Sequence, residues 1–137
     1  MLVGLYSALA RKFLAPARRF VAENCYKPTT EDIRICRQSL MARGEMPRNK
    51  DFWSMSGCRD VLFHVMEHEF TIPQIETFLD ENRLTFRGFE QLQPGVLEQF
   101  RHQFPDASPY DLAAWHAFER ANVHAFINMY VFWIQKE

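Results

Sequence analysis

The pattern of apolar and polar positions along the chain predicts mostly helices. Between residues 56 and 68, apolar residues recur with the i, i+3, i+4, i+7, i+8 spacing of one helix face, at Cys58, Val61, Leu62, Val65 and Met66. Ser56 stands where the N-cap of such a helix is expected, and the pattern ends near His68. This stretch is therefore predicted to form an amphipathic helix.

Similar patterns predict further helices, bounded by capping residues, prolines and glycines. Thr29 followed by Asp32 approximates a capping box, and Gly44 suits a helix end. Thr71 is a comparable start, with Pro73 in the first turn. These signals place helices at residues 16–25, 29–44, 71–82, 94–105, 108–121 and 122–133. The stripe expected to be buried in the helix after Thr71 consists of Ile72, Ile75, Phe78 and Leu79.

Residues 84–90 have the pattern of a short strand instead, with Leu84, Phe86 and Phe89 spaced among polar or small residues. A strand needs a partner, and residues 1–6 are the best other candidate, although they also suit the start of a helix. The expected fold class is therefore mainly α. It is a single domain over residues 1–137, with about six or seven helices and a possible small antiparallel β pair between residues 1–6 and 84–90.

Composition adds an expectation of self-association. Apolar residues make up 47% of the chain and 13 residues are Phe, which favours a crowded core or an apolar surface shared with a partner. The helix expected at residues 122–133 leaves little polar face, so it must be buried in the domain or against another chain. Its candidate interface residues are Phe126, Met129, Tyr130 and Trp133. A homo-oligomer or a complex with a partner protein is the expected state.

Charge and cysteine content limit which binding partners and which cellular compartment are expected for the protein. Sixteen Lys and Arg oppose 17 Asp and Glu, so no net positive field favours nucleic acid. Cys25, Cys36 and Cys58 form no CxxC pair and are predicted to be buried thiols of a protein in a reducing compartment. No stretch approaches the roughly 20 apolar residues of a membrane span, and the first apolar run lacks the features of a signal peptide. These observations predict a cytoplasmic protein without a membrane partner.

His64, Glu67 and His68 form an H-x-x-E-H motif, in which two histidines one helical turn apart bind zinc and the glutamate acts as a base. A metal-dependent hydrolase of this kind needs a third ligand, usually a glutamate well downstream, and no later glutamate stands in a recognisable ligand motif. A structural pair of histidines on a helix is the favoured interpretation. Motifs for a nucleophile elbow, a P-loop and a dinucleotide site do not occur in the sequence.

Several separate segments, in the same order, resemble the C-terminal portion of bacterial class I S-adenosylmethionine-dependent methyltransferases, particularly those that also carry tetratricopeptide repeats. The segments are GLYSALAR at residues 4–11, IRICRQ at 33–38, CRDVLFHVMEHEFTIPQI at 58–75, LTFRGFE at 84–90, and WHAFE with NMYVFWIQK between 115 and 136. The resemblance spans nearly the whole chain.

The resemblance implies both a fold and a pocket. In such enzymes GLYS would close the fifth strand of the methyltransferase sheet, and LTFRGFE would lie antiparallel beside it. The intervening helices would form an insertion on the side where the acceptor substrate binds. The residues that would line an acceptor pocket by this analogy are Tyr6, Ser7, Arg59, His64, Glu67 and His68. The resemblance assigns none of them a catalytic role.

The chain departs from these enzymes in one respect, because the Gly-rich loop that holds the cofactor belongs upstream of the residues present here. Methyl transfer requires the cofactor's methyl group to be held in line with its acceptor. We therefore expect no cofactor and no enzymatic activity of the chain on its own. The leading hypothesis is a non-enzymatic binding or protein-interaction module derived from the substrate-side region of a methyltransferase. The alternatives are an accessory subunit that completes a methyltransferase in trans, and the metal-dependent hydrolase with the motif at residues 64–68.

Overall fold

The computed structural model describes residues 1–63 and 67–137, and the chain divides into two compact units. The first unit combines Met1–Arg11 with His68–Glu137, and we call it the sheet unit. The second unit, Lys12–Glu67, is called the helical unit. Each unit has its own core of buried apolar residues.

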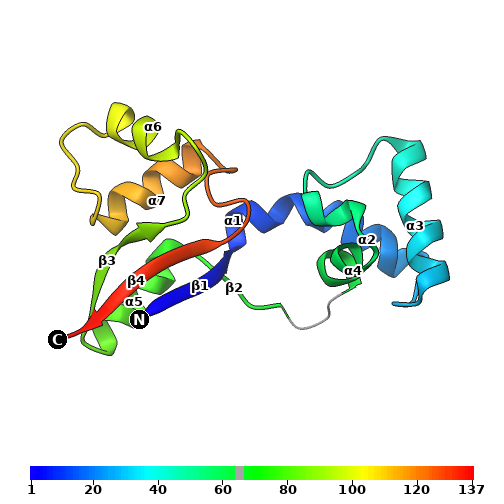
Figure 1. Ribbon diagram of the computed structural model, residues 1–137, viewed down its shortest axis with the longest axis horizontal. Helices are drawn as coiled ribbons and strands as arrows, with labels where there is room; N and C mark the ends of the chain where they lie inside the picture. The colour runs from blue at the N-terminus through cyan, green and yellow to red at the C-terminus, as the bar shows by residue number, and fades with distance from the viewer. Residues whose placement is uncertain (64–66) are drawn as a thin grey trace. The chain divides into compact units, whose positions relative to one another are not determined.

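The sheet unit contains a four-stranded mixed sheet, which corrects the expected mainly α fold. Its strands are β1 (Leu2–Ser7), β2 (Glu69–Phe70), β3 (Leu84–Glu90) and β4 (Tyr130–Lys136), in the order β2-β1-β4-β3. The short strand β2 runs parallel to β1, whereas β4 is antiparallel to both β1 and β3 (Figure 1). Residues 1–6 and 84–90 do form strands. The predicted pairing between them is wrong, because β4 lies between β1 and β3.

The C-terminal segment forms the strand β4, where a helix was predicted. Tyr130, Phe132 and Ile134 are buried, and the residues between them are less buried, which is the two-residue period of a strand. An apolar run of this length can belong to a buried helix or to a central strand, and periodicity alone does not separate the two. Pairing with strands on both sides decides the outcome for β4.

Helices pack on the sheet and form an aromatic core with it. They are α1 (Ala8–Arg11), α5 (Ile72–Glu81), α6 (Val96–Gln103) and α7 (Leu112–Ala121). Phe100 of α6 stacks on Trp115 of α7, with ring centroids 3.9 Å apart. Phe89 of β3 contacts Trp115 and also Phe132 of β4, so the core joins the helices to the sheet.

The helical unit is built from short helices around a second core. It contains α2 (Ala15–Glu23), α3 (Thr30–Arg43) and α4 (Met55–Cys58), with 3-10 turns η1 (Lys12–Leu14) and η2 (Lys50–Trp53) and a π-helical turn η3 (Arg59–Phe63). Its most buried side chains are Leu14, Ile33, Cys36, Leu40, Phe52 and Cys58.

Capping signals located some helix ends correctly and others not. Thr29 caps α3, Gly44 ends it in the left-handed conformation, and Thr71 caps α5. The helix predicted from Ser56 is present over Met55–Phe63, but its cap is Ser54 and it changes from the α-helix α4 to the π-helical turn η3 after Cys58. Residues 64–66 of that prediction lie outside the described residues.

Candidate functional site

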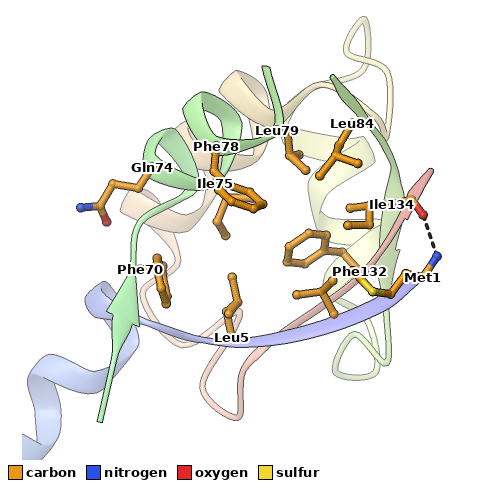
Figure 2. Close-up of a pocket in the computed structure, with 11 residues that line it drawn as sticks. Met1, Leu5, Phe70, Gln74, Ile75, Phe78, Leu79, Leu84, Phe132 and Ile134 are labelled. Atoms are coloured by element: carbon orange, nitrogen blue, oxygen red, sulfur yellow. Dashed lines mark hydrogen bonds between the residues drawn. The ribbon is translucent and has the colours of Figure 1, made fainter. Parts of the chain in front are cut away.

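A cavity lies between α5 and one face of the sheet. Side chains alternate between the two faces of a strand, so Val3 and Leu5 of β1 point to the same face. Val3 is paired with Phe132 of β4, which therefore points to that face as well. Ile75 of α5 approaches them from above, and Leu5, Phe132 and Ile75 point into a common space (Figure 2). Val3 also lines this space.

The cavity has a volume of about 310 Å³ and an almost entirely apolar wall. It is lined by Met1, Val3, Leu5, Phe70, Gln74, Ile75, Phe78, Leu79, Leu84, Phe132 and Ile134. Gln74 is the one polar side chain among these described residues, and its amide points away from the apolar groups (Figure 2). Pockets of this size with apolar walls are typical sites for small ligands. The wall suits a hydrocarbon group, because no charged side chain of the described residues lines it.

Two residues of α5 mark the mouth of the cavity. Phe78 was predicted to be buried, but its side chain is 54% exposed although it lines the cavity. Gln74 uses its amide oxygen in the cap of α5, where it accepts hydrogen bonds from the backbone N–H and the hydroxyl of Thr71, at 2.9 and 3.1 Å. Both residues also border a shallow, open depression on the surface of α5, which continues over Pro73, Thr77 and Glu81.

A hydrogen-bonded cluster of polar side chains lies in a different part of the sheet unit. The Ser7 hydroxyl donates a hydrogen bond of 2.5 Å to Oε1 of Glu119, and the Tyr130 hydroxyl lies 2.8 and 2.9 Å from the two carboxyl oxygens. The backbone N–H of Ala10 donates to Ser7 Oγ at 3.1 Å. This cluster links β1, α7 and β4.

Burial shapes the chemistry of this cluster. The exposed fractions of Ser7, Glu119 and Tyr130 are 0%, 1% and 0%, so a substrate in solvent has no access to them. Burial raises the pKa of Glu119, and the hydrogen bonds from Ser7 and Tyr130 and the nearby His116 oppose this effect. Burial likewise raises the pKa of Tyr130. The cluster is a buried polar connection between three elements of the fold.

The described residues among those expected in an acceptor pocket are divided between the two units. Tyr6 is half-buried on β1, with the guanidinium carbon of Arg11 4.0 Å from its ring centroid. Ser7 points into the buried cluster. Arg59 is exposed on η3 of the helical unit, and His68 is exposed at the start of the second segment of the sheet unit.

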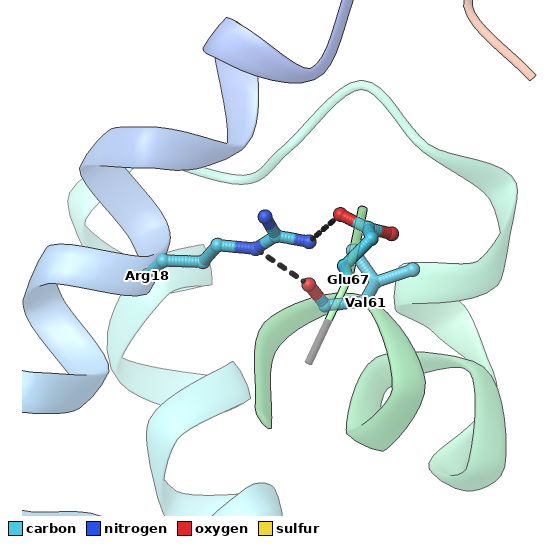
Figure 3. A network of polar contacts seen from close by, with 3 residues as sticks. All are labelled: Arg18, Val61 and Glu67. Carbon is cyan, nitrogen blue, oxygen red and sulfur yellow. Dashed lines mark hydrogen bonds and ion pairs between the residues drawn. The ribbon is translucent and has the colours of Figure 1, made fainter. Parts of the chain in front are cut away.

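Glu67 of the H-x-x-E-H motif binds an arginine of the helical unit. Arg18 donates from Nη2 to Glu67 Oε2 at 2.6 Å and from Nε to the carbonyl of Val61 at 3.0 Å (Figure 3). His64 lies outside the described residues. Within residues 1–63 and 67–137, no group of three or more His, Cys, Asp or Glu side chains is placed to hold a metal ion.

The predicted interface residues do not share one helical face, because the helix that carried them is replaced by β4 and the segment before it. Phe126 and Tyr130 are 3% and 0% exposed and belong to the core of the sheet unit. Trp133 is 44% exposed on the sheet face opposite the cavity, and the Met129 side chain would contact a Cβ at Gly4. None of the helices in the described part of the chain has the length and apolar character needed to cross a membrane.

Sequence reasoning missed the cavity. Its residues come from four strands and a helix, and no local motif connects them. A partial signal was present in residues 1–6, where Val3 and Leu5 are two positions apart and therefore on one face of a strand. The buried cluster gave no local motif either, because Ser7, Glu119 and Tyr130 come from three separate elements of the chain.

No protein-family model matches the chain, and no curated protein matches it. The likeness to methyltransferases therefore stays a prediction from the sequence.

Proposed function

We propose that this chain is a non-enzymatic binding module whose sheet unit takes up a small apolar ligand between α5 and the sheet. The observation that carries the proposal is the cavity of about 310 Å³ with its apolar wall. Burial of hydrocarbon there is favourable by about 0.8 kcal/mol for each CH₂ group removed from water. Binding rather than catalysis is supported by the burial of the Ser7, Glu119 and Tyr130 cluster away from solvent.

Descent from the substrate-side region of a methyltransferase is part of the proposal and rests on the sequence resemblance. Residence in the cytoplasm and self-association rest on composition alone. No contact in either unit adds to the alternative of an accessory subunit. The hydrolase alternative rests on the motif alone, because His64 lies outside the described residues.

The proposal is tested by filling the cavity. Val3→Phe places a ring in it, and Val131→Phe is a matched control. Val131 is paired with Gly4, one position along from the pair of Val3 and Phe132, so it faces the opposite side of the sheet. Both valines are half-buried on adjacent strands. Calorimetric titration with n-octanol should give binding to the natural chain and the Val131→Phe control. We expect Val3→Phe to weaken it by about tenfold or more, because the ring takes up ligand volume.

A second filling variant, Leu5→Phe, keeps the test decisive if Val3→Phe fails to fold, as monitored by circular dichroism. Absence of n-octanol binding to the natural chain would contradict the proposal. Equal weakening by the substitutions on both faces of the sheet would also contradict it.

A further inference from the structure

We infer that the ligand is a cationic amphiphile, with a slender apolar tail in the cavity and an amine head group on the adjoining depression of α5. This inference rests on the proposed function and adds the chemical class of the ligand. It follows from the size of the cavity, the two lining residues that the cavity shares with the depression, and the charge at the depression.

The size of the cavity sets the length of the tail. A water molecule takes up about 30 Å³ of the liquid, and a methylene group is of similar size, so the cavity has room for about ten such groups. A chain of about eight to ten carbon atoms therefore fits. Apart from Gln74, the side chains around this space are those of aliphatic residues, Met1 and Phe, and none of these offers a hydrogen bond to a polar group inside.

The two hollows adjoin at two shared residues. Gln74 and Phe78 line both the cavity and the depression. With Thr77 and Glu81 they are spaced three and four residues apart on α5, so they form one strip along the helix. A ligand whose tail lies beside Phe78 therefore leaves the cavity next to the polar side chains of this strip.

Charge at the depression selects the head group. Among the side chains of the described residues that line the two hollows, that of Glu81 is the charged one, and it makes no hydrogen bond or ion pair with another described residue. The α-ammonium group of Met1, which also lines the cavity, donates to the backbone carbonyl of Ile134 at 2.7 Å. The remaining charges of α5, at Glu76 and Asp80, are also negative, and the helix contains no basic residue. A carboxylate head group would be repelled here, and an ammonium group would be attracted.

The test compares three ligands of equal length that differ in charge: n-octylamine, n-octanol and n-octanoate. Calorimetric titration of the full chain at low ionic strength should show that n-octylamine binds about two- to fivefold more tightly than n-octanol, the range expected for an exposed charge pair. We expect n-octanoate to bind most weakly. Added salt should reduce these differences, because it screens exposed charges.

Two matched variants test whether Glu81 causes the preference for the amine over the alcohol. Glu81→Gln should abolish the advantage of the amine over the alcohol. Glu76→Gln removes an equal charge from the same helix at a residue that lines neither hollow, and it should keep most of the advantage. Both residues are exposed, so neither substitution should disturb the fold.

The outcomes separate the two proposals. If n-octanoate binds as tightly as n-octylamine, or if the preference for the amine survives Glu81→Gln, the inference about the head group is overturned and apolar binding stands. If none of the three ligands binds, the proposed function itself fails.

Discussion

Glu119 is a carboxyl group buried among partners that its local sequence does not contain. It shares the buried face of α7 with Leu112 and Trp115, and its side chain is 1% exposed and hydrogen-bonded to Ser7 and Tyr130. Helical periodicity specifies which residues share a face with Glu119. It does not specify that hydroxyl groups from β1 and β4 will meet its carboxyl group, because those residues are distant along the chain.

Replacement of Glu119 by Gln should change how stability depends on pH. In the unfolded chain the carboxyl group ionises near its ordinary pKa of 4.5, and burial raises this pKa in the folded protein. Between the two values the folded state holds more protons than the unfolded state, so its free energy of unfolding decreases as pH rises. The contribution of Glu119 to stability is complete at pH values below its pKa in the unfolded chain. It is lost as the pH rises through the pKa of Glu119 in the folded protein.

The side chain introduced by Glu119→Gln cannot ionise. The free energy of unfolding of this variant should therefore not show the decrease with rising pH. Relative to the natural chain, the variant should gain up to about 1.4 kcal/mol for each pH unit within that interval. Urea unfolding at about pH 5 and about pH 8 measures the change. The exposed Glu98→Gln serves as the control and should follow the natural chain. A parallel pH dependence of Glu119→Gln and the natural chain would refute the assignment.

At the scale of single elements, α5 shows what local signals can specify. Thr71 and Gln74 form a capping box, which the residues around Thr71 and Pro73 pointed to as a helix start. Periodicity also identified Ile72, Ile75 and Leu79 as its buried stripe, and all three are buried. Local rules worked here because capping and amphipathicity involve residues only three or four positions apart.

Removal of the N-cap of α5 should make the folded protein less stable. Thr71→Ala loses the hydroxyl that accepts from the backbone N–H of Gln74, and the free energy of unfolding should decrease by about 1 kcal/mol. Urea unfolding measures the decrease. Thr77→Ala is the control on the same helix, since its exposed hydroxyl caps nothing and donates to the carbonyl of Pro73. Its effect should stay within about 0.5 kcal/mol. Equal effects of the two substitutions would count against the capping role of Thr71.

The segment around β4 shows where local signals fail. Nearly every residue between Tyr130 and Ile134 is apolar, and the same letters suit a buried helix. The strand forms because neighbours on both sides satisfy its backbone hydrogen bonds. Those neighbours come from opposite regions of the chain, so no window of local sequence contains the deciding information.

At the scale of the whole molecule, the central place of β4 can be tested by cross-linking. Leu2 and Trp133 are directly paired, and they alternate with the hydrogen-bonded pair of Met1 and Ile134. Their Cα atoms should be about 4.5 Å apart, within reach of a disulfide. Oxidation of Leu2→Cys/Trp133→Cys, in a chain with the exposed Cys25→Ser, should therefore form this bond, detected by mass spectrometry of its peptides.

A matched pair distinguishes this topology from the one expected from sequence. Thr85 is paired with Gln135 of β4, so β3 and β1 are two strand spacings apart, or about 10 Å. Leu2→Cys/Thr85→Cys should therefore stay reduced under the same conditions, since this exceeds the span of a disulfide. A cross-link between β1 and β3, with none between β1 and β4, would restore the direct pairing of residues 1–6 and 84–90.

The sequence by itself determined the local features of this protein: the starts of α3 and α5, the end of α3, and the strand character of residues 84–90. Each depends on residues a few positions apart, whose backbone and side-chain preferences act within one turn or one strand. Only the tertiary structure decided that β4 joins β1 to β3, that Glu119 is buried, and that side chains from distant segments enclose an apolar cavity. These features depend on contacts between residues far apart in the chain, and local periodicity carries no information about them.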